Sequence, residues 1–210
     1  QTGGPSGGCL AEKFLDTPID YENLVAAGSM MGSGGMVVMD ETSCMVAIAK
    51  FYLEFTCEES CGKCSPCRIG NKRMLEILDK ITDGRGTMED LQELRNLAAV
   101  IKDAALCGLG QTSPNPVLST LDNFWDEYVE HVVDKKCRAG VCKKLMNYEI
   151  DKEKCIGCGK CAKNCPGEAI SKTDYIAEGH KLPSMWIDTT KCIKCGACIA
   201  GCKFGAISVK

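Results

Sequence analysis

The feature that constrains this chain most is the grouping of its cysteines. Three times along the sequence, three cysteines recur at every third residue. They are Cys61, Cys64 and Cys67; Cys155, Cys158 and Cys161; and Cys192, Cys195 and Cys198. Two residues between neighbouring thiols allow one short loop to direct all three at a single centre, which is how chains hold cubane iron–sulfur clusters. The spacing therefore predicts three metal centres, each of which needs a fourth ligand.

The odd number and the spacing of the cysteines argue against a disulfide-bonded secreted protein. Cysteine makes up 17 of the 210 residues, a content that in a short secreted chain indicates a disulfide scaffold. The number is odd, however, and no basic stretch followed by an apolar segment indicates a secretory signal. We therefore predict a reducing, cytoplasmic environment. A chain that begins at Gln1 is expected to be cut or processed.

Two further classes of protein are excluded by composition. No apolar run approaches the roughly 18 residues of a membrane-spanning helix, so we predict no membrane insertion. The formal net charge is -3, whereas a nucleic-acid groove needs clustered Lys and Arg. We therefore expect protein or small-molecule partners and no nucleic acid.

The C-terminal part of the chain contains an internal repeat with a shift of 37 residues. The stretch IDKEKCIGCGKCAKNCPGEAIS from Ile150 aligns with IDTTKCIKCGACIAGCKFGAIS from Ile187, and every cysteine coincides. Each copy predicts a short strand, a cysteine loop, a helical turn with a fourth cysteine, and a second strand. The first copy has the usual proline after the fourth cysteine, and the second has Lys203 there. We expect this departure to be tolerated because the thiolates make the bonds.

This repeat has the pattern of bacterial two-cluster ferredoxins, in which the fourth cysteine of each run ligates the other cluster. The pattern predicts two [4Fe-4S] clusters with crossed ligands. One is held by Cys155, Cys158, Cys161 and Cys202, and the other by Cys192, Cys195, Cys198 and Cys165. A pair of structural zinc sites is the alternative, but zinc ribbons seldom place four cysteines so closely twice.

The middle of the chain, residues 42–134, is predicted to form a four-helix bundle. Apolar residues recur at helical spacing in four successive stretches. The expected core positions are Val46, Ile48, Phe51 and Leu53; Met74, Ile77, Leu78 and Ile81; Leu91, Leu94, Leu97 and Ile101; and Leu118, Leu121, Trp125 and Tyr128. The turn at 83–86, followed by Thr87 and the acidic residues 89–90, predicts a helix end and then a capping box.

The first cysteine triplet lies inside this bundle. Cys61, Cys64 and Cys67 directly precede a predicted helix, whose N-terminal amides can stabilise negative charge. We predict Cys107 as the fourth ligand of a third [4Fe-4S] cluster. Cys107 lies in a glycine-rich break where the chain can fold back over the end of the bundle and approach a cluster closely.

Several of these segments resemble one known family. The string SCGKCSPCRIG at 60–70, followed by the Cys-Gly-Leu-Gly loop at 107–110, is similar to the cluster-binding segment of the flavoprotein subunit of respiratory complex I. The stretches QTGGPSGGCL at 1–10 and GSMMGSGGMVVMD at 28–40 resemble the second half of its soluble-ligand-binding β-grasp domain.

A ferredoxin-like tail after that bundle resembles a narrower group. It is similar to the NAD(P)-reactive flavoprotein subunits of soluble, electron-bifurcating [FeFe] hydrogenases and of related formate dehydrogenases. This resemblance implies that FMN and NAD(P) bind in a domain before the β-grasp unit. The chain has no flavin or dinucleotide fingerprint of its own, because the glycine-rich stretch at 3–8 lacks a following helix. We therefore interpret it as the C-terminal part of a longer subunit, without catalytic residues.

The function that the resemblance implies is electron relay. Electrons would pass between the flavin, soluble ferredoxin and a hydrogenase catalytic subunit, together with a small [2Fe-2S] thioredoxin-like subunit in a hetero-oligomer. Alternatives are the same subunit type in a bifurcating formate dehydrogenase, and a non-bifurcating NADH dehydrogenase-type diaphorase. An alternative from another class is an assembly scaffold in which the metals are structural.

Five cysteines remain after the three clusters are assigned. Three cysteines and one histidine form the ligand set of a closed zinc site, which would clamp a hinge. The hypothesis from the sequence is that Zn(II) is bound by Cys57, His131, Cys137 and Cys142. A fourth iron–sulfur centre and ordinary buried thiols are the alternatives. Cys9 and Cys44 are interpreted as small buried residues.

The predicted architecture is α+β and multidomain. Residues 1–41 are expected to be the second half of a β-grasp domain, and 42–134 the bundle. Residues 135–146 are expected to form a linker or hinge with the zinc site, and 147–210 the ferredoxin-like domain.

Overall fold

The computed structural model describes residues 1–209, and these form two compact units. The first unit is Gln1–Leu145 and consists of helices and loops. The second unit begins at Met146 and carries the four short strands. Each unit has a hydrophobic core of its own.

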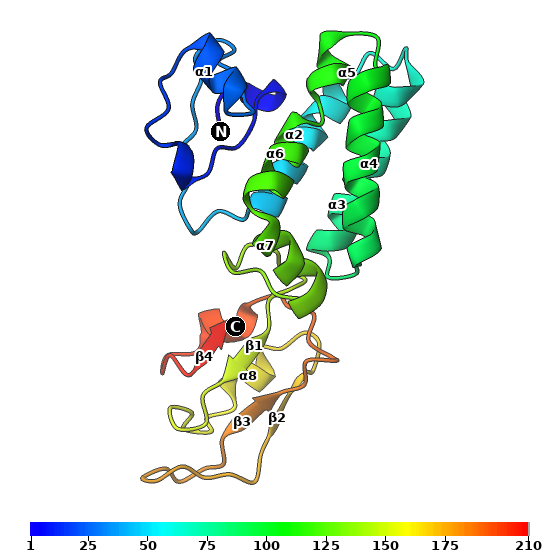
Figure 1. The fold of residues 1–210 in the computed structure, drawn as a ribbon. Coiled ribbons are helices and arrows are strands. Elements are labelled where there is room, and N and C mark those ends of the chain that lie inside the picture. Colours follow the sequence, from blue (N-terminus) through cyan, green and yellow to red (C-terminus); the bar gives the residue numbers. More distant parts are fainter. Residues whose placement is uncertain (210) are drawn as a thin grey trace. The chain divides into compact units, whose positions relative to one another are not determined.

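Four helices form the body of the first unit (Figure 1). They are α2 (Met45–Glu59), α3 (Asn71–Thr82), α4 (Met88–Ala104) and α6 (Asn115–Asn123). Helix α2 packs against α3 and α6, and α4 packs against the same two helices, so the four surround one core. Shorter elements join or follow them: η3 (Pro66–Gly70), α5 (Gly108–Thr112), α7 (Trp125–Val129) and η4 (Glu130–Asp134).

The predicted start of α4 is confirmed in detail. The Thr87 hydroxyl accepts a hydrogen bond from the Asp90 backbone N–H, and the Asp90 carboxylate accepts one from the Thr87 backbone N–H. This capping box satisfies two amides that have no partner within the helix. Lys80 also pairs with the Asp90 carboxylate and ties the end of α3 to the start of α4.

The core of the bundle contains most of the expected positions, but two of them are wrong. Phe51 is 61% exposed and Trp125 is 41% exposed, whereas Leu53, Met74 and Leu94 are fully buried. The buried face of α2 includes Ala49 and Leu53, and Phe51, two residues from each, lies on the opposite face of the helix. At Trp125 the fourth expected helix is interrupted, since α6 ends at Asn123 and α7 starts anew.

Residues 1–41 contain η1 (Gly4–Ser6), η2 (Glu12–Phe14) and α1 (Tyr21–Ala26). The only β pairing there, within the described residues, is two isolated bridges that Thr2 makes with Gly8 and Met36. The predicted β-grasp half is therefore not visible as strands and stays a prediction. Side chains of α6 hold the segment in place: the Asn115 amide donates to the Ser6 carbonyl, and the Ser119 hydroxyl accepts from the Cys9 N–H.

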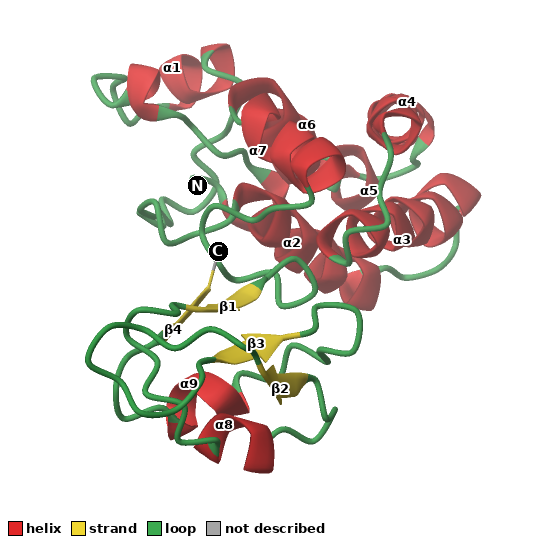
Figure 2. Ribbon diagram, turned by 90° about the horizontal axis from the view of Figure 1, so that it is seen from below, coloured by secondary structure: helices red, strands yellow, loops and turns green. Residues whose placement is uncertain are grey.

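The second unit repeats its elements in two halves. The first half contains β1 (Tyr148–Ile150), α8 (Lys160–Lys163) and β2 (Ile170–Lys172). The second half contains β3 (Met185–Ile187), α9 (Ala197–Gly201) and β4 (Ile207–Val209). Figure 2 shows α8 and α9 together beside the strands. The sequence repeat is therefore a structural repeat.

The strands of the two halves are exchanged. Strand β1 pairs with β4, and β2 pairs with β3, both in antiparallel register. Because each half ends on a strand that pairs with the other half, the cysteine just before that strand is carried across as well. The strand exchange therefore places the fourth cysteine of each half near the three cysteines of the other half, as the predicted crossed ligand sets require.

No helix within residues 1–209 combines the length and the apolar character needed to cross a membrane.

Candidate metal centres

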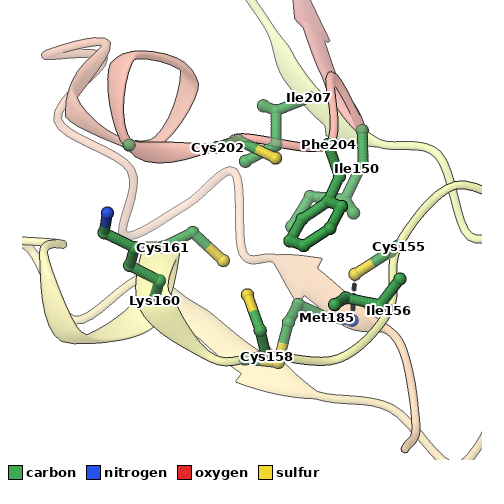
Figure 3. Close-up of a pocket in the computed structure, with 12 residues that line it drawn as sticks. Ile150, Cys155, Ile156, Cys158, Lys160, Cys161, Met185, Cys202, Phe204 and Ile207 are labelled. Atoms are coloured by element: carbon green, nitrogen blue, oxygen red, sulfur yellow. Dashed lines mark hydrogen bonds between the residues drawn. The ribbon is translucent and has the colours of Figure 1, made fainter. Parts of the chain in front are cut away.

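The first hollow of the second unit collects the four cysteines predicted for one cluster. It is lined by Cys155, Cys158 and Cys161 from one half and by Cys202 from the other. Figure 3 shows their sulfur atoms on the walls of this hollow. The remaining lining is largely apolar and includes Phe204. Four thiols around one apolar hollow are the donor set that a cubane cluster requires.

A second hollow collects the other predicted set. It is lined by Cys192, Cys195 and Cys198, together with Cys165 from the first half. Backbone N–H groups donate to one sulfur in each hollow: that of Met185 to Cys155 Sγ at 3.4 Å and that of Ala169 to Cys165 Sγ at 3.3 Å. The structure thus brings together both sets of four cysteines that the crossed pattern predicts.

The triplet in the bundle lies where η3 approaches α5. Cys61 and Cys64 lie in the loop before η3, Cys67 lies within η3, and Cys107 is the residue that caps α5. A side-chain Cβ at Gly110 would lie 3.1 Å from Cys67 Cβ, so only glycine lets α5 come this close. The loop that carries Cys107 is therefore packed against the triplet, as the prediction requires.

The electrostatics of this loop favour a thiolate. Backbone N–H groups of Leu106 and Cys67 lower the pKa of Cys64 below its ordinary value. The thiolate is the form that binds metal. Because Leu106 directly precedes Cys107, its hydrogen bond to Cys64 also holds the Cys107 loop next to the triplet.

A fourth group of ligands is only partly predicted by the sequence. Cys44, His131, Cys137 and Cys142 are all buried, and their ligand atoms lie within 4.8 Å of one another. His131 Nε2 is 3.3 Å from Cys44 Sγ and 3.4 Å from Cys142 Sγ, and the two sulfurs are 3.8 Å apart. Tetrahedral zinc with ordinary bond lengths requires about 3.8 Å between sulfurs and about 3.6 Å from sulfur to nitrogen. These residues therefore fit a Cys₃His zinc site in ligand type and in distance.

The prediction that Cys57 belongs to this group is wrong. Cys57 lies in the last turn of α2, whereas Cys44 caps the opposite end of the same helix. Thirteen residues of helix separate the two by roughly 20 Å. Burial raises the pKa of Cys57 to about 11, and the Cys67 thiol is the next influence on it, so Cys57 belongs to the end of the bundle with the cysteine triplet.

Cys44 takes the place of Cys57, so its interpretation as an ordinary buried thiol is corrected. No regular spacing relates it to His131 or to the pair at 137 and 142, because the bundle brings them together from distant parts of the chain. The only local signal is that Cys44 directly precedes the first long helix.

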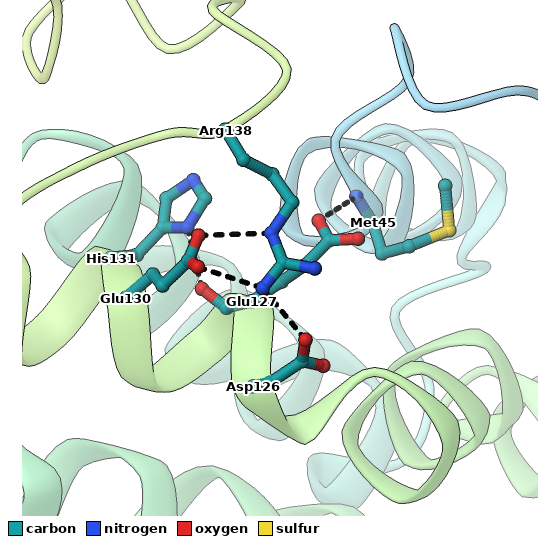
Figure 4. Close-up of polar contacts among 6 residues, drawn as sticks. All are labelled: Met45, Asp126, Glu127, Glu130, His131 and Arg138. Atoms are coloured by element: carbon teal, nitrogen blue, oxygen red, sulfur yellow. Dashed lines mark hydrogen bonds and ion pairs between the residues drawn. The ribbon is translucent and has the colours of Figure 1, made fainter. Parts of the chain in front are cut away.

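Hydrogen bonds and surface ion pairs hold the segments that carry the ligands of this site (Figure 4). His131 Nδ1 is 2.7 Å from the Glu127 carbonyl, so Nδ1–H donates and Nε2 is left free to bind a metal. The Glu127 carboxylate accepts a hydrogen bond from the Met45 N–H, next to Cys44. Arg138, next to Cys137, pairs with Glu130 and Asp126. Three segments that supply ligands are thereby tied together.

Hydrogen bonds between the thiols and the imidazole of this site change the pKa of His131 and of Cys137. Burial opposes protonation of His131, but hydrogen bonds with Cys137 and Cys44 outweigh it and raise its pKa to about 10. Hydrogen bonds with Cys142 and Cys44 hold the pKa of Cys137 well below its ordinary value. A metal ion would replace the shared proton in such a group, and its binding would release protons.

Comparison with known proteins supports the assignment of these regions. Residues 47–131 match the family described as the NADH-ubiquinone oxidoreductase-F iron-sulfur binding region. Residues 154–206 match the 4Fe-4S dicluster domain. The chain thus carries the iron–sulfur binding region of NADH-ubiquinone oxidoreductase-F-type subunits in residues 47–131 and a 4Fe-4S dicluster domain in residues 154–206. The resemblance to the NAD(P)-reactive flavoprotein subunit of a hydrogenase, recognised from the sequence, is thereby confirmed.

Individual relatives agree with this assignment. The chain is 64% identical over 173 residues to the NADP-reducing hydrogenase subunit HndC of Solidesulfovibrio fructosivorans, a match that covers 82% of the chain and 35% of that protein. It is 40% identical over 135 residues to an NADH-quinone oxidoreductase subunit of Streptomyces coelicolor, covering 64% of the chain and 30% of that protein. The chain thus spans about a third of the length of these relatives.

A solved structure is similar as well. An NAD+-reducing [NiFe]-hydrogenase in the H2-reduced state superposes with a TM-score of 0.57 at 30% sequence identity. The superposition covers 63% of this chain and 22% of the hydrogenase chain. The relatives and this structure include both hydrogenases and NADH-quinone oxidoreductases, and all are oxidoreductases or parts of them.

Proposed function

We propose that the chain relays electrons through three [4Fe-4S] clusters in an NAD(P)-linked hydrogenase. Twelve cysteines would hold them: Cys61, Cys64, Cys67 and Cys107 in the bundle; Cys155, Cys158, Cys161 and Cys202 in one hollow; and Cys192, Cys195, Cys198 and Cys165 in the other. The observation that carries this proposal is the sorting of eight repeat cysteines into two hollows with four thiols each. The protein supplies ligands, burial and hydrogen bonds, while the redox chemistry belongs to the clusters.

The route of the electrons depends on parts of the assembly outside this chain. FMN and NAD(P) would bind on preceding parts of the same subunit. The bundle cluster would exchange electrons with the flavin, and the second unit with soluble ferredoxin or the hydrogenase catalytic subunit. A small [2Fe-2S] thioredoxin-like subunit would complete the complex. We favour an [FeFe] catalytic subunit and electron bifurcation, with formate dehydrogenase and diaphorase assemblies as the alternatives.

We also propose that Cys44, His131, Cys137 and Cys142 bind one Zn(II). A site in which every ligand is protein and buried has no open position for substrate, so the metal would be structural. Cys142 lies three residues before Leu145, the last residue of the first unit. The ion would therefore fix the end of the first unit to its bundle.

The relay is tested by redox titration of the subunit in its native complex, followed by EPR. Reversible reduction at low potential, with cubane signals from all three sites, is the expected result. Clusters that cannot be cycled reversibly would support the scaffold alternative instead. Purification of the complex with its partners distinguishes a hydrogenase from a formate dehydrogenase, since the catalytic subunit is identified directly by mass spectrometry.

A further inference from the structure

We propose that the Asn71 side-chain amide, oriented by Ser113, raises the reduction potential of the bundle cluster through a hydrogen bond to the Cys67 sulfur. This inference rests on the proposed function in one respect, which is that Cys67 is a cluster ligand. It adds two residues outside the cysteine motif to the description of the relay.

Both residues are buried against the predicted ligand. Asn71 is the first residue of α3 and is 1% exposed, and Ser113 follows α5 and is 2% exposed. Asn71 Nδ2 donates to Cys67 Sγ at 3.4 Å. Asn71 Oδ1 accepts a hydrogen bond from the Ser113 hydroxyl at 2.8 Å. Water has no access to this amide, so these contacts determine what it does.

The partners also fix which end of the amide faces the sulfur. A thiolate can only accept hydrogen bonds, and the Asn71 carbonyl oxygen has no proton to give. The opposite orientation would place that oxygen against the Cys67 sulfur, with two acceptors facing each other and no proton between them. Ser113 can share its proton between Asn71 Oδ1 and the Gly110 carbonyl at 2.9 Å. The N–H end is therefore held toward Cys67.

The expected direction of the effect follows from charge. Adding an electron makes the cluster and its thiolates more negative, so a hydrogen-bond donor stabilises the reduced form more than the oxidised form. In the second unit, the donors to Cys155 and Cys165 are backbone N–H groups, which remain when a side chain is exchanged for any residue other than proline. At Cys67 the neighbouring donors are side chains, Asn71 Nδ2 at 3.4 Å and the Ser60 hydroxyl at 3.2 Å, so the contribution of Asn71 can be removed by substitution while that of Ser60 is kept.

The test is Asn71→Leu in the full-length subunit, with EPR-monitored redox titration. The bundle cluster is identified as the signal that Cys107→Ala abolishes. At the wild-type midpoint potential, the ratio of reduced to oxidised bundle cluster should fall by about tenfold, while the other two signals keep their potentials. Asn96→Leu is the matched control, because Asn96 is exposed on α4 and should leave all three potentials unchanged.

Ser113→Ala is the second variant and removes the group that orients Asn71. It should shift the same cluster in the same direction by a smaller factor. An unchanged potential in iron-replete Asn71→Leu and Ser113→Ala proteins overturns the proposal. Loss of the cluster in both variants also overturns it, because Asn71 would then act in assembly. If Cys107→Ala removes no signal, the proposed function of the bundle cysteines fails instead, and the two failures are distinguished.

Discussion

Two cysteine-rich sites in the first unit are built in opposite ways. At Cys44, His131, Cys137 and Cys142 every ligand is buried and the ligand atoms lie within 4.8 Å of one another. At the triplet in the bundle, Cys61 in the loop before η3 and Cys107 at the start of α5 are exposed, and only Cys67, within η3, is buried. A closed site suits a metal that holds the fold together, whereas an open one suits a cluster that must exchange electrons.

The polar groups around the two sites also differ. Charged side chains hold the segments around the closed site, with Arg138 bridging Glu130 and Asp126 on its surface. Around the open site, neutral donors such as Asn71 and the Leu106 amide point at the sulfurs themselves. The ion pairs at the closed site fix the positions of the ligands, whereas the neutral donors at the open site stabilise negative charge on the ligand sulfurs.

The largest effect is expected when the closed site loses a ligand. Cys142→Ala should lower zinc affinity by at least about 100-fold and shift the thermal unfolding of the first unit to lower temperature. Iron content should not change. Zinc is measured by elemental analysis and unfolding by calorimetry. Cys57→Ala is the control that should keep its zinc, and zinc loss in Cys57→Ala would contradict the assignment of Cys44.

Removal of Cys107, the predicted fourth ligand at the open site, should change the iron and sulfide contents and leave the zinc content unchanged. Cys107→Ala is expected to lose about four iron atoms and about four sulfides and to retain zinc. Elemental and sulfide analysis under anaerobic conditions measure this. If zinc is lost together with iron, the two sites are not independent and the comparison fails.

The clamp around the closed site should have a moderate effect. Arg138→Gln removes the ion pairs that hold the loop after Cys137, so zinc affinity should fall by about 10- to 100-fold. Competition with a chromogenic chelator measures the affinity. The matched control is Arg95→Gln, which breaks an exposed ion pair with Asp122 away from the site and should leave zinc affinity unchanged. Equal effects of both variants would mean that general destabilisation weakens the site.

The smallest effect is expected at the start of α4. Thr87→Ala removes the capping hydroxyl and should lower the free energy of unfolding of the first unit by about 1 kcal/mol. Denaturant unfolding measures this value. Because Thr87 contacts neither site, iron and zinc contents should stay as in the wild type. Metal loss in this variant would show that metal content simply follows stability.

How far the structure can be predicted from the sequence depends on the range of the interactions. The repeat predicts the second unit well, because a local pattern of cysteines, glycines and isoleucines specifies each half and the strand exchange follows from it. The capping box at Thr87 is equally local. The choice of Cys57 over Cys44 is wrong because both lie near one helix, and only its packing shows which end meets His131. Phe51 is wrong for a different reason: it does not share the helical period of the buried residues Ala49 and Leu53, so it lies on the outer face of α2.

The most direct test of the account is anaerobic analysis of iron, sulfide and zinc in the wild type and in Cys44→Ser. The account predicts about twelve iron, about twelve sulfide and about one zinc per wild-type chain, and loss of zinc alone in Cys44→Ser. About sixteen iron without zinc would place a fourth redox cluster at the closed site. Zinc without iron would contradict the electron relay itself.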